Sequence, residues 1–98
     1  MVYLLYAAQA TLRHKAWHKA KQLFLNGEFE QAKPAFQKLV KQAPSNANYN
    51  YWYGACCYET GRKKEAQPYL EKSAARKVID AYRYLGKLYY DIYRLTMP

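Results

Sequence analysis

Apolar positions in the middle of the chain recur with the spacing of an α-helix. Between residues 47 and 60 they are Tyr49, Tyr53, Cys56 and Cys57. Placed at 100° per residue, these side chains fall within an arc of about 100°. The arc predicts the buried face of a helix. The other positions, several of them aromatic, predict a face turned away from the core.

Turn and cap residues divide the chain into five predicted helices. Asn26-Gly27 and Gly61 are helix-stop signals, and Ala43-Pro44-Ser45-Asn46 predicts a turn. Thr11 is the residue that we expect to cap the first helix. The predicted helices cover residues 11–25, 29–42, 47–60, 63–75 and 79–93. The fold class that follows is all-α.

The chain repeats itself with a period of 34 residues. In each matched pair a small residue falls on a small one, a turn glycine on a turn glycine, or a bulky apolar residue on another. The pairs are Ala20 with Gly54, Gly27 with Gly61, Ala32 with Ala66, and Phe36 with Leu70. A fixed period of this length is typical of stacked helical repeats.

The spacing follows the pattern W-x2-L-G-x2-Y…A-x3-F…P. The first copy reads Ala16-x2-Lys19-Ala20-x2-Leu23, Ala32-x3-Phe36 and Pro44; the second reads Asn50-x2-Tyr53-Gly54-x2-Cys57 and Ala66-x3-Leu70; a partial third reads Tyr82-x2-Leu85-Gly86-x2-Tyr89. On these residues the chain resembles the tetratricopeptide repeat family, from about Thr11 to Ile92. It departs from the pattern at Lys19 and Asn50, where leucine and tryptophan are expected.

The resemblance implies antiparallel helix-turn-helix repeats stacked as a short right-handed solenoid. The expected divisions are an N-terminal extension or signal remnant (residues 1–12), repeat one (13–46), repeat two (47–78) and the first helix of a third repeat acting as a cap (79–98). A cap normally has a polar outer face, but this one carries many tyrosines. We therefore expect either a part of a longer array, which we favour because the third repeat stops midway, or self-association through the aromatic ends.

The first ten residues, MVYLLYAAQA, are apolar but too few to span a bilayer. Ala8-Gln9-Ala10 is similar to a small-x-small signal cleavage site. Two interpretations stay open. The segment is the remnant of an export signal, which would place the protein in the periplasm or cell envelope, or it extends the first helix of a cytoplasmic protein.

In the family that the chain resembles, the first helix of each repeat lines a concave surface that binds the ligand. The resemblance therefore implies a peptide groove formed by His14, Trp17, His18, Lys21, Phe24, Asn48, Tyr51, Trp52, Tyr58, Arg83, Tyr84 and Lys87. These residues would make an aromatic trough with positive charge at both ends. Aromatic rings and arginine dominate binding energy at interfaces. The alternative is that neighbouring repeats or the N-terminal segment cover the rings.

Charge adds a second constraint on the partner. Sixteen Lys and Arg against seven Asp and Glu give a net charge of +9, which favours acidic partners. Our first hypothesis is a protein-interaction scaffold that binds a peptide in the groove, where an acidic peptide would complement the charge. The others are nucleic-acid binding through basic surface and exposed rings, and an architectural N-terminal repeat region of a larger cell-envelope protein. The carboxylate clamp of some family members is not expected, because only Lys21 has a suitable charge at the corresponding positions.

Candidate catalytic or metal-binding residues are few. His14 and His18 are four residues apart, but the lysines around them would repel a cation. Cys56 and Cys57 point about 100° apart on a helix and predict core packing rather than a disulfide or a zinc site. The chain has no phosphate-binding loop or nucleophile elbow. We therefore expect a protein that is not an enzyme and that uses no cofactor and no metal.

Overall fold

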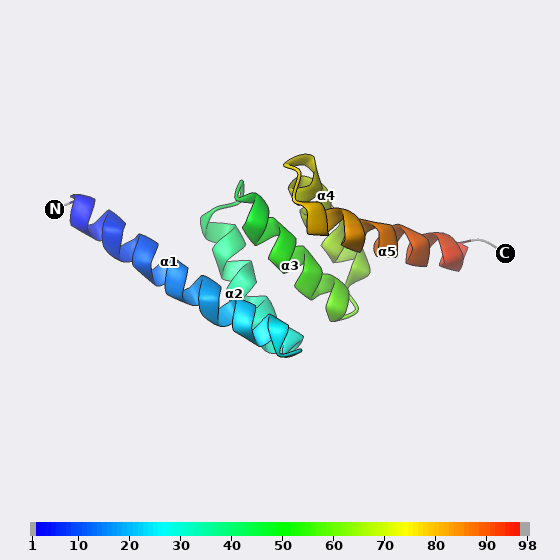
Figure 1. Cartoon of the computed structure of the whole chain (residues 1–98), viewed down its shortest axis with the longest axis horizontal. Helices are drawn as coiled ribbons and strands as arrows, with labels where there is room; N and C mark the ends of the chain where they lie inside the picture. Colours follow the sequence, from blue (N-terminus) through cyan, green and yellow to red (C-terminus); the bar gives the residue numbers. More distant parts are fainter. Residues whose placement is uncertain (1, 97–98) are drawn as a thin grey trace.

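The computed structural model describes residues 2–96, and the part of the chain that it describes is all-α (Figure 1). The helices are α1 (Val2–Leu25), α2 (Phe29–Gln42), α3 (Ala47–Glu59), α4 (Lys63–Ala75) and α5 (Ile79–Thr96). Each helix packs against the next one, and α3 also packs against α5. This is the all-α repeat solenoid that the sequence predicts.

The molecule is elongated, with extents of 62 × 27 × 18 Å. The N-terminal half of α1 extends past the end of α2, and the C-terminal half of α5 extends away from α4 in the opposite direction (Figure 1). The two chain ends therefore lie at opposite ends of the solenoid. The helices between them form its compact centre.

The core of each repeat is built where its two helices cross at small residues. Ala20 of α1 and Ala32 of α2 are fully buried at the first crossing. At the second crossing, a Cβ added to Gly54 would lie only 2.8 Å from Cγ of Leu70. The backbones of α3 and α4 approach this closely because position 54 has no side chain. The 34-residue period therefore reflects the same type of helix crossing in both repeats.

Three turns use a residue in the left-handed backbone region. Gly27 and Gly61 have φ angles of 81° and 83°, as their positions in the period predict. The third is Lys77, which has a φ of 65° in the turn before α5. In all three turns the next residue donates its backbone N–H to a carbonyl five residues back, which closes the helix end. The third turn could not be predicted from the residue type, because a lysine is conformationally unfavourable in this region.

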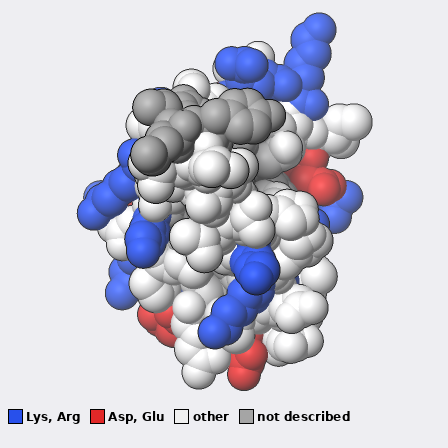
Figure 2. Space-filling view, turned by 90° about the vertical axis from the view of Figure 1, so that its left-hand side faces the viewer, with Lys and Arg blue, Asp and Glu red and all other residues white. Residues whose placement is uncertain are grey.

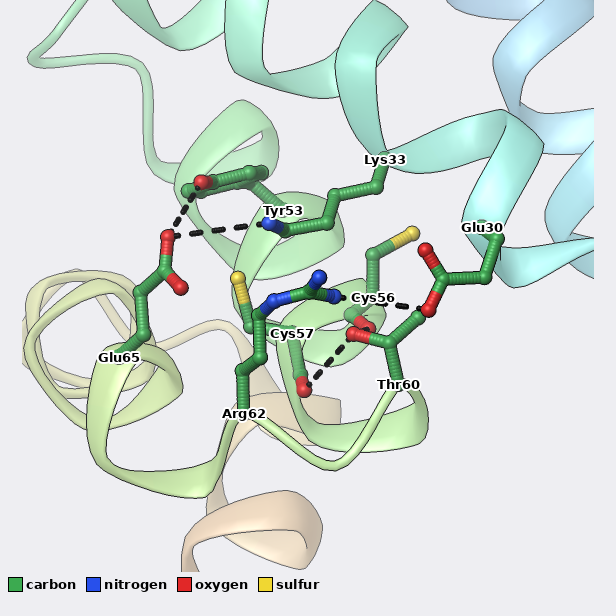
Figure 3. Close-up of polar contacts among 8 residues, drawn as sticks. All are labelled: Glu30, Lys33, Tyr53, Cys56, Cys57, Thr60, Arg62 and Glu65. Carbon is green, nitrogen blue, oxygen red and sulfur yellow. Dashed lines mark hydrogen bonds and ion pairs between the residues drawn. The ribbon is translucent and has the colours of Figure 1, made fainter.

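A polar network joins the two repeats next to the core (Figure 3). The buried Tyr53 of α3 donates its hydroxyl to Oε1 of Glu65 of α4 at 2.8 Å. Lys33 of α2 lies 3.9 Å from the same oxygen. Burial and this hydrogen bond raise the pKa of Tyr53 well above its ordinary value. The hydroxyl therefore remains a donor and holds α3 and α4 in register.

Cys56 and Cys57 are fully buried free thiols in α3 (Figure 3). Burial raises the pKa of Cys56 to about 12 and that of Cys57 to about 11. A thiol is a nucleophile and a metal ligand only as the thiolate. The two cysteines are core residues, as their helical spacing predicts.

Asn50 stands where the repeat pattern expects tryptophan, and the structure explains the replacement. Its side chain is buried, and Nδ2 donates to the carbonyl oxygens of Pro44 at 2.9 Å and of Asn46 at 2.8 Å. Asn46 in turn caps α3 by accepting the backbone N–H of Tyr49 at 3.1 Å. Asn50 therefore fixes the turn between the repeats instead of filling a large apolar volume.

The predicted start of the first helix is wrong. α1 begins at Val2, and Thr11 lies inside it, where its hydroxyl donates to the carbonyl oxygen of Ala7 at 3.0 Å. The first ten residues contain no glycine or proline that would stop a helix, so Thr11 has no exposed N-terminal amides to cap. Residues 2–10 are thus continuous with this helix, and the interpretation of the segment as a signal remnant stays a prediction. The predicted end of the last helix at residue 93 is also too early, since α5 continues to Thr96.

Among residues 2–96, none of the helices combines the length and the hydropathy that crossing a lipid bilayer requires.

Candidate functional site

A connected series of aromatic rings crosses from α1 over α3 to α5. We call this series the aromatic ladder; it consists of Trp17, Trp52, Tyr51, Tyr84 and Tyr58. Neighbouring ring centroids are 5.9 Å apart for Trp17 and Trp52, 5.3 Å for Trp52 and Tyr51, 6.0 Å for Tyr51 and Tyr84, and 5.5 Å for Tyr84 and Tyr58. The contacts are edge-to-face, the arrangement that aromatic quadrupoles favour. Residues from three separate helices are thus brought onto one surface.

The ladder rests on the core instead of projecting from it. Trp52 stacks on the buried Phe36 with ring centroids 5.9 Å apart, and Trp17 meets the same ring at 5.9 Å. Phe24 packs edge-on against Trp52 at 5.0 Å. Trp17, Trp52, Phe24 and Tyr84 are each half-buried. These rings pack on the core and keep part of their surface exposed. That they form a peptide groove stays a prediction.

Tyr51 does not meet the prediction of a solvent-facing residue. It is only 8% exposed. Its ring lies between those of Trp52 and Tyr84, at the point where α5 approaches α3. The helical arc of α3 alone cannot show this burial, because α5 supplies the cover.

Three lysines lie over rings of the ladder. The Nζ atom of Lys21 is 5.4 Å from the centroids of both Trp17 and Trp52. Lys87 lies 5.3 Å from the ring of Tyr84, and Lys63 lies 5.5 Å from that of Tyr58. These are cation–π distances, and they hold positive charge at the α1 side and at the α5 side of the ladder.

Arg83, which was predicted for the groove, is engaged differently. It forms an exposed ion pair with Asp80 of the same helix, with its Nη2 atom 3.2 Å from the carboxylate. A surface pair of this kind has a stabilising effect of only about 0–1 kcal/mol. The guanidinium is therefore available for exchange with another carboxylate at little cost.

Two carboxylates on the outward faces of α3 and α5 tie the ladder to α5. Tyr58 of α3 donates to Oδ2 of Asp91 at 2.7 Å, and Lys63 of α4 approaches the same oxygen to 2.9 Å. Tyr84 of α5 donates to Oε1 of Glu59 at 2.9 Å. The partners are 33 and 25 residues apart in sequence, so no local pattern could have indicated these contacts.

The tyrosine hydroxyls of the ladder stay protonated over the physiological pH range. Burial, followed by the nearby Asp80 carboxylate, raises the pKa of Tyr51 to about 12. Burial and the bond to Asp91 raise the pKa of Tyr58 to about 12. In return, the hydrogen bonds from Lys63 and Tyr58 lower the pKa of Asp91. The ladder therefore presents rings and neutral hydroxyls, with no acid–base group poised near neutrality.

A hollow of about 300 Å³ lies beside the α1 end of the ladder. It is lined by Ala10, His14, Trp17, Asn46, Asn48 and Tyr49. The structure thus brings together the predicted groove residues His14, Trp17 and Asn48. His18 lies next to them, with its Nε2 atom 3.1 Å from that of His14. The exposed imidazoles and the Asn48 amide supply hydrogen-bond donors and acceptors around an apolar indole.

A larger hollow lies elsewhere and was not predicted. It has a volume of about 500 Å³ between α1 and α2, and it is lined by Gln9, Leu12, Arg13, Ala16, Ala35, Lys38, Leu39 and Gln42. No residue of the aromatic ladder contributes to it. We assign the candidate site to the ladder, because the ladder carries the rings and charges that recognition requires.

Positive charge is spread around the molecule. In the view from the N-terminal end of α1, Lys and Arg side chains lie at the left, top and right of the outline and in the lower centre, whereas fewer Asp and Glu side chains are visible (Figure 2). The net charge of +9 therefore does not gather on the ladder alone. Among the described residues, no group of three or more His, Cys, Asp and Glu is arranged to hold a metal ion.

Comparison with known protein families gives a match. The sequence model of a family described as Tetratricopeptide repeat matches residues 18–82, about two thirds of the chain. Comparisons with curated proteins and with solved structures gave no significant match.

Proposed function

This chain belongs to the tetratricopeptide repeat family, and on that premise we propose that it is a scaffold module that binds a peptide segment of a partner protein on its aromatic ladder. Repeats of this family generally mediate protein–protein interaction, and their fold is typically not catalytic. What we propose beyond the family's general role is the binding surface on this chain and the chemistry of the peptide segment that it binds.

The observation that carries the proposal is the continuity of the ladder. Its rings connect α1, α3 and α5, so a peptide that lies across these helices would contact half-buried rings on either side of the buried Tyr51. Preformed rings lose little conformational entropy on binding, which favours affinity. A small groove of this kind is consistent with a dissociation constant in the micromolar range, or about −8 kcal/mol.

The charges favour an acidic peptide. Lys21 and Lys87 keep their ammonium groups over the rings at either side of the ladder. His14, His18 and Asn48 add hydrogen-bonding groups beside the hollow at the α1 end. A peptide with carboxylates spaced to reach both lysines would satisfy these donors while an apolar side chain packs on the indoles.

The test compares two double variants with the same net charge. Lys21→Glu with Lys87→Glu reverses charge over the ladder, and Lys41→Glu with Lys72→Glu reverses two exposed lysines of α2 and α4. Each protein is immobilised and used to capture partners from native lysate after nuclease treatment. We expect the first variant to lose a protein that the wild type and the second variant retain. Emission from Trp17 and Trp52, the two tryptophans of the chain, should respond to that partner.

Equal weakening in both variants would contradict the proposal. That result, together with a steep loss of binding between 50 and 200 mM salt, would indicate counterion release from nucleic acid instead.

A further inference from the structure

Two exposed histidines of α1 bring their ring nitrogens together. His14 and His18 are four residues apart, so their side chains lie on the same face of the helix. Their Nε2 atoms are 3.1 Å apart, and the two ring planes meet at 87° with centroids 4.5 Å apart. At this distance one ring donates its Nε2–H to the Nε2 lone pair of the other. Both Nε2 atoms therefore face the same small space.

The separation of two nitrogen atoms decides whether they can bind one metal ion together. Zn–N bonds are about 2.0–2.1 Å long, so two imidazole ligands of one ion are about 3.3 Å apart at a tetrahedral angle and about 2.9 Å apart at a right angle. The 3.1 Å between the Nε2 atoms of His14 and His18 lies between these values. The helix therefore holds the two nitrogens at the spacing of a chelate, and only the rings have to rotate.

Binding of an ion changes where the ring protons lie and releases none of them. The ion needs the Nε2 lone pair of both rings, so the ring that donates in the pair must carry its proton on Nδ1 instead. Both histidines are exposed, so each Nδ1–H can donate to water. The ion thus replaces one exposed hydrogen bond, and no buried group has to move.

The lysines near the pair project away from it or are engaged with rings. Lys15 and Lys19 each follow a histidine by one residue and therefore project about 100° around the helix from it. Both are exposed, where water and salt screen their charge. Lys21 shares the face of His14, but its Nζ atom lies 5.4 Å from the ring centroids of both tryptophans. None of these ammonium groups has to occupy the space between the ring nitrogens.

The surroundings of the pair leave coordination positions open. His14 lines the hollow of about 300 Å³ at the α1 end of the aromatic ladder, together with Trp17 and Asn48. In the described part of the chain, no third His, Cys, Asp or Glu joins the pair as a ligand. Two imidazoles leave at least two positions of a tetrahedral ion to water, and the hollow beside His14 has room for several water molecules.

The ligand type indicates which ions fit. Imidazole nitrogen suits Zn²⁺, Ni²⁺ and Cu²⁺, whereas Mg²⁺ and Ca²⁺ prefer oxygen ligands. Neither neutral ring supplies the negative charge that binds a hard cation. The pair therefore selects transition metal ions over the more abundant alkaline-earth ions.

We propose that His14 and His18 form a chelating site for a divalent transition metal ion of the zinc, nickel and copper type. The remaining positions of the ion hold water, which a carboxylate or an imidazole of another molecule can displace. The sequence alone predicts no metal, because lysines surround the pair; the separation of the ring nitrogens, which the structure supplies, favours an ion. The site does not depend on the peptide that the ladder binds.

The test uses Zn²⁺ alone and a variant of identical composition. His18→Gln with Gln22→His exchanges two exposed side chains of α1 and keeps the net charge and both histidines. The histidines are then eight residues, or about 12 Å, apart along the helix and cannot bind one ion together. Ligand imidazoles must be neutral, so each protein is titrated at about pH 7.5 in a buffer that does not bind metal. The Cε1–H signals of the two histidines are followed by NMR.

We expect one Zn²⁺ per chain to shift both signals of the wild type together. Binding to the exchanged variant should be at least tenfold weaker, because the second imidazole no longer binds intramolecularly. His14→Gln, which keeps one histidine, should lose as much, and Mg²⁺ should shift neither signal of the wild type.

Circular dichroism establishes that both variants are folded. Equal affinity of the wild type and the exchanged variant for Zn²⁺ would overturn the proposal, because each imidazole would then bind an ion on its own. Absence of shifts up to millimolar Zn²⁺ would also overturn it, and so would a response to Mg²⁺ equal to that for Zn²⁺.

Discussion

Gly54 and Gly86 occupy equivalent positions in successive repeats, yet their surroundings differ. The first glycine lies at a helix crossing, where an added Cβ would come within 2.8 Å of Cγ and 3.2 Å of the backbone nitrogen of Leu70. The second has no atom of this kind within 4 Å. The same residue therefore permits close packing at one site and only weakens the helix at the other.

Alanine at these two positions should change stability in opposite directions. For Gly54→Ala, overpacking costs about 1–3 kcal/mol and exceeds the gain of about 1 kcal/mol from removing a helical glycine, so we expect a net loss of about 1 kcal/mol. For Gly86→Ala only the gain applies, and the free energy of unfolding should rise by up to about 1 kcal/mol. Urea denaturation followed by circular dichroism measures both. A shift of the same sign at both positions would contradict the crossing described here.

At the scale of the helices, Asp91 joins three of them. It accepts from Tyr58 of α3 at 2.7 Å and from Lys63 of α4 at 2.9 Å, while it belongs to α5 itself. The other polar contacts between α5 and the preceding repeat include hydrogen bonds of Tyr82, Tyr84 and Tyr89. Asp91 contacts both α3 and α4 through one oxygen, so the attachment of α5 should be weaker when this carboxylate is not ionised.

Acid should weaken the attachment of α5 once the pH falls below the ordinary pKa of Asp91. The folded-state pKa of Asp91 lies below its ordinary value of 3.8, so its contribution to stability is present above that pH and is lost as the pH falls below it. Asp91→Asn should lower the melting temperature at neutral pH and reduce the further loss on acidification to about pH 2. The melting temperature measured against pH for the wild type, Asp91→Asn and Asp80→Asn tests this.

Asp80→Asn serves as the control, because its ion pair with Arg83 stays within α5. An acid response of Asp91→Asn identical to that of the wild type would show that the carboxylate does not hold α5.

The sequence was sufficient to predict the helices and crossings that depend on residues close together in the chain. The period located Ala20, Gly54 and the turn glycines, since each interacts with its own or the next helix. The period did not locate the start of α1. No helix-stop residue precedes Thr11, and helix-forming residues do not themselves mark where a helix begins.

The candidate site was harder to predict, because its state depends on contacts between repeats. Tyr51 lies on the outward arc of α3, and only the position of Tyr84 on α5 buries it. Glu59 and Asp91 become part of the site through hydrogen bonds across 25 and 33 residues. A single sequence can predict on which face of a helix a residue lies. It does not predict which neighbouring helix packs over that face. The functional role of the predicted groove residues stays a prediction.

Considered as a whole, the molecule is a short solenoid with two kinds of surface. The aromatic ladder crosses α1, α3 and α5 and rests on the core, whereas Ile79, Tyr82, Tyr89 and Tyr90 of α5 are exposed at one end of the stack. Exposed lysines or arginines lie on α1, α2, α4 and α5, and on the face drawn in Figure 2 they are not gathered at one point. If the ladder binds a peptide as we propose, specific recognition comes from its rings, because charge spread over several helices gives only general attraction to acidic molecules.

The most direct measurement is site-specific photo-crosslinking from the ladder face in native lysate. A photoreactive phenylalanine analogue replaces Asn48, which is exposed beside the hollow, and in a second protein it replaces Lys41, which is exposed on α2. We predict a discrete protein adduct from position 48 that survives nuclease and high salt and is absent from position 41. Equal adducts from both positions, or adducts that nuclease removes, would contradict the assignment of the ladder as a peptide-binding site.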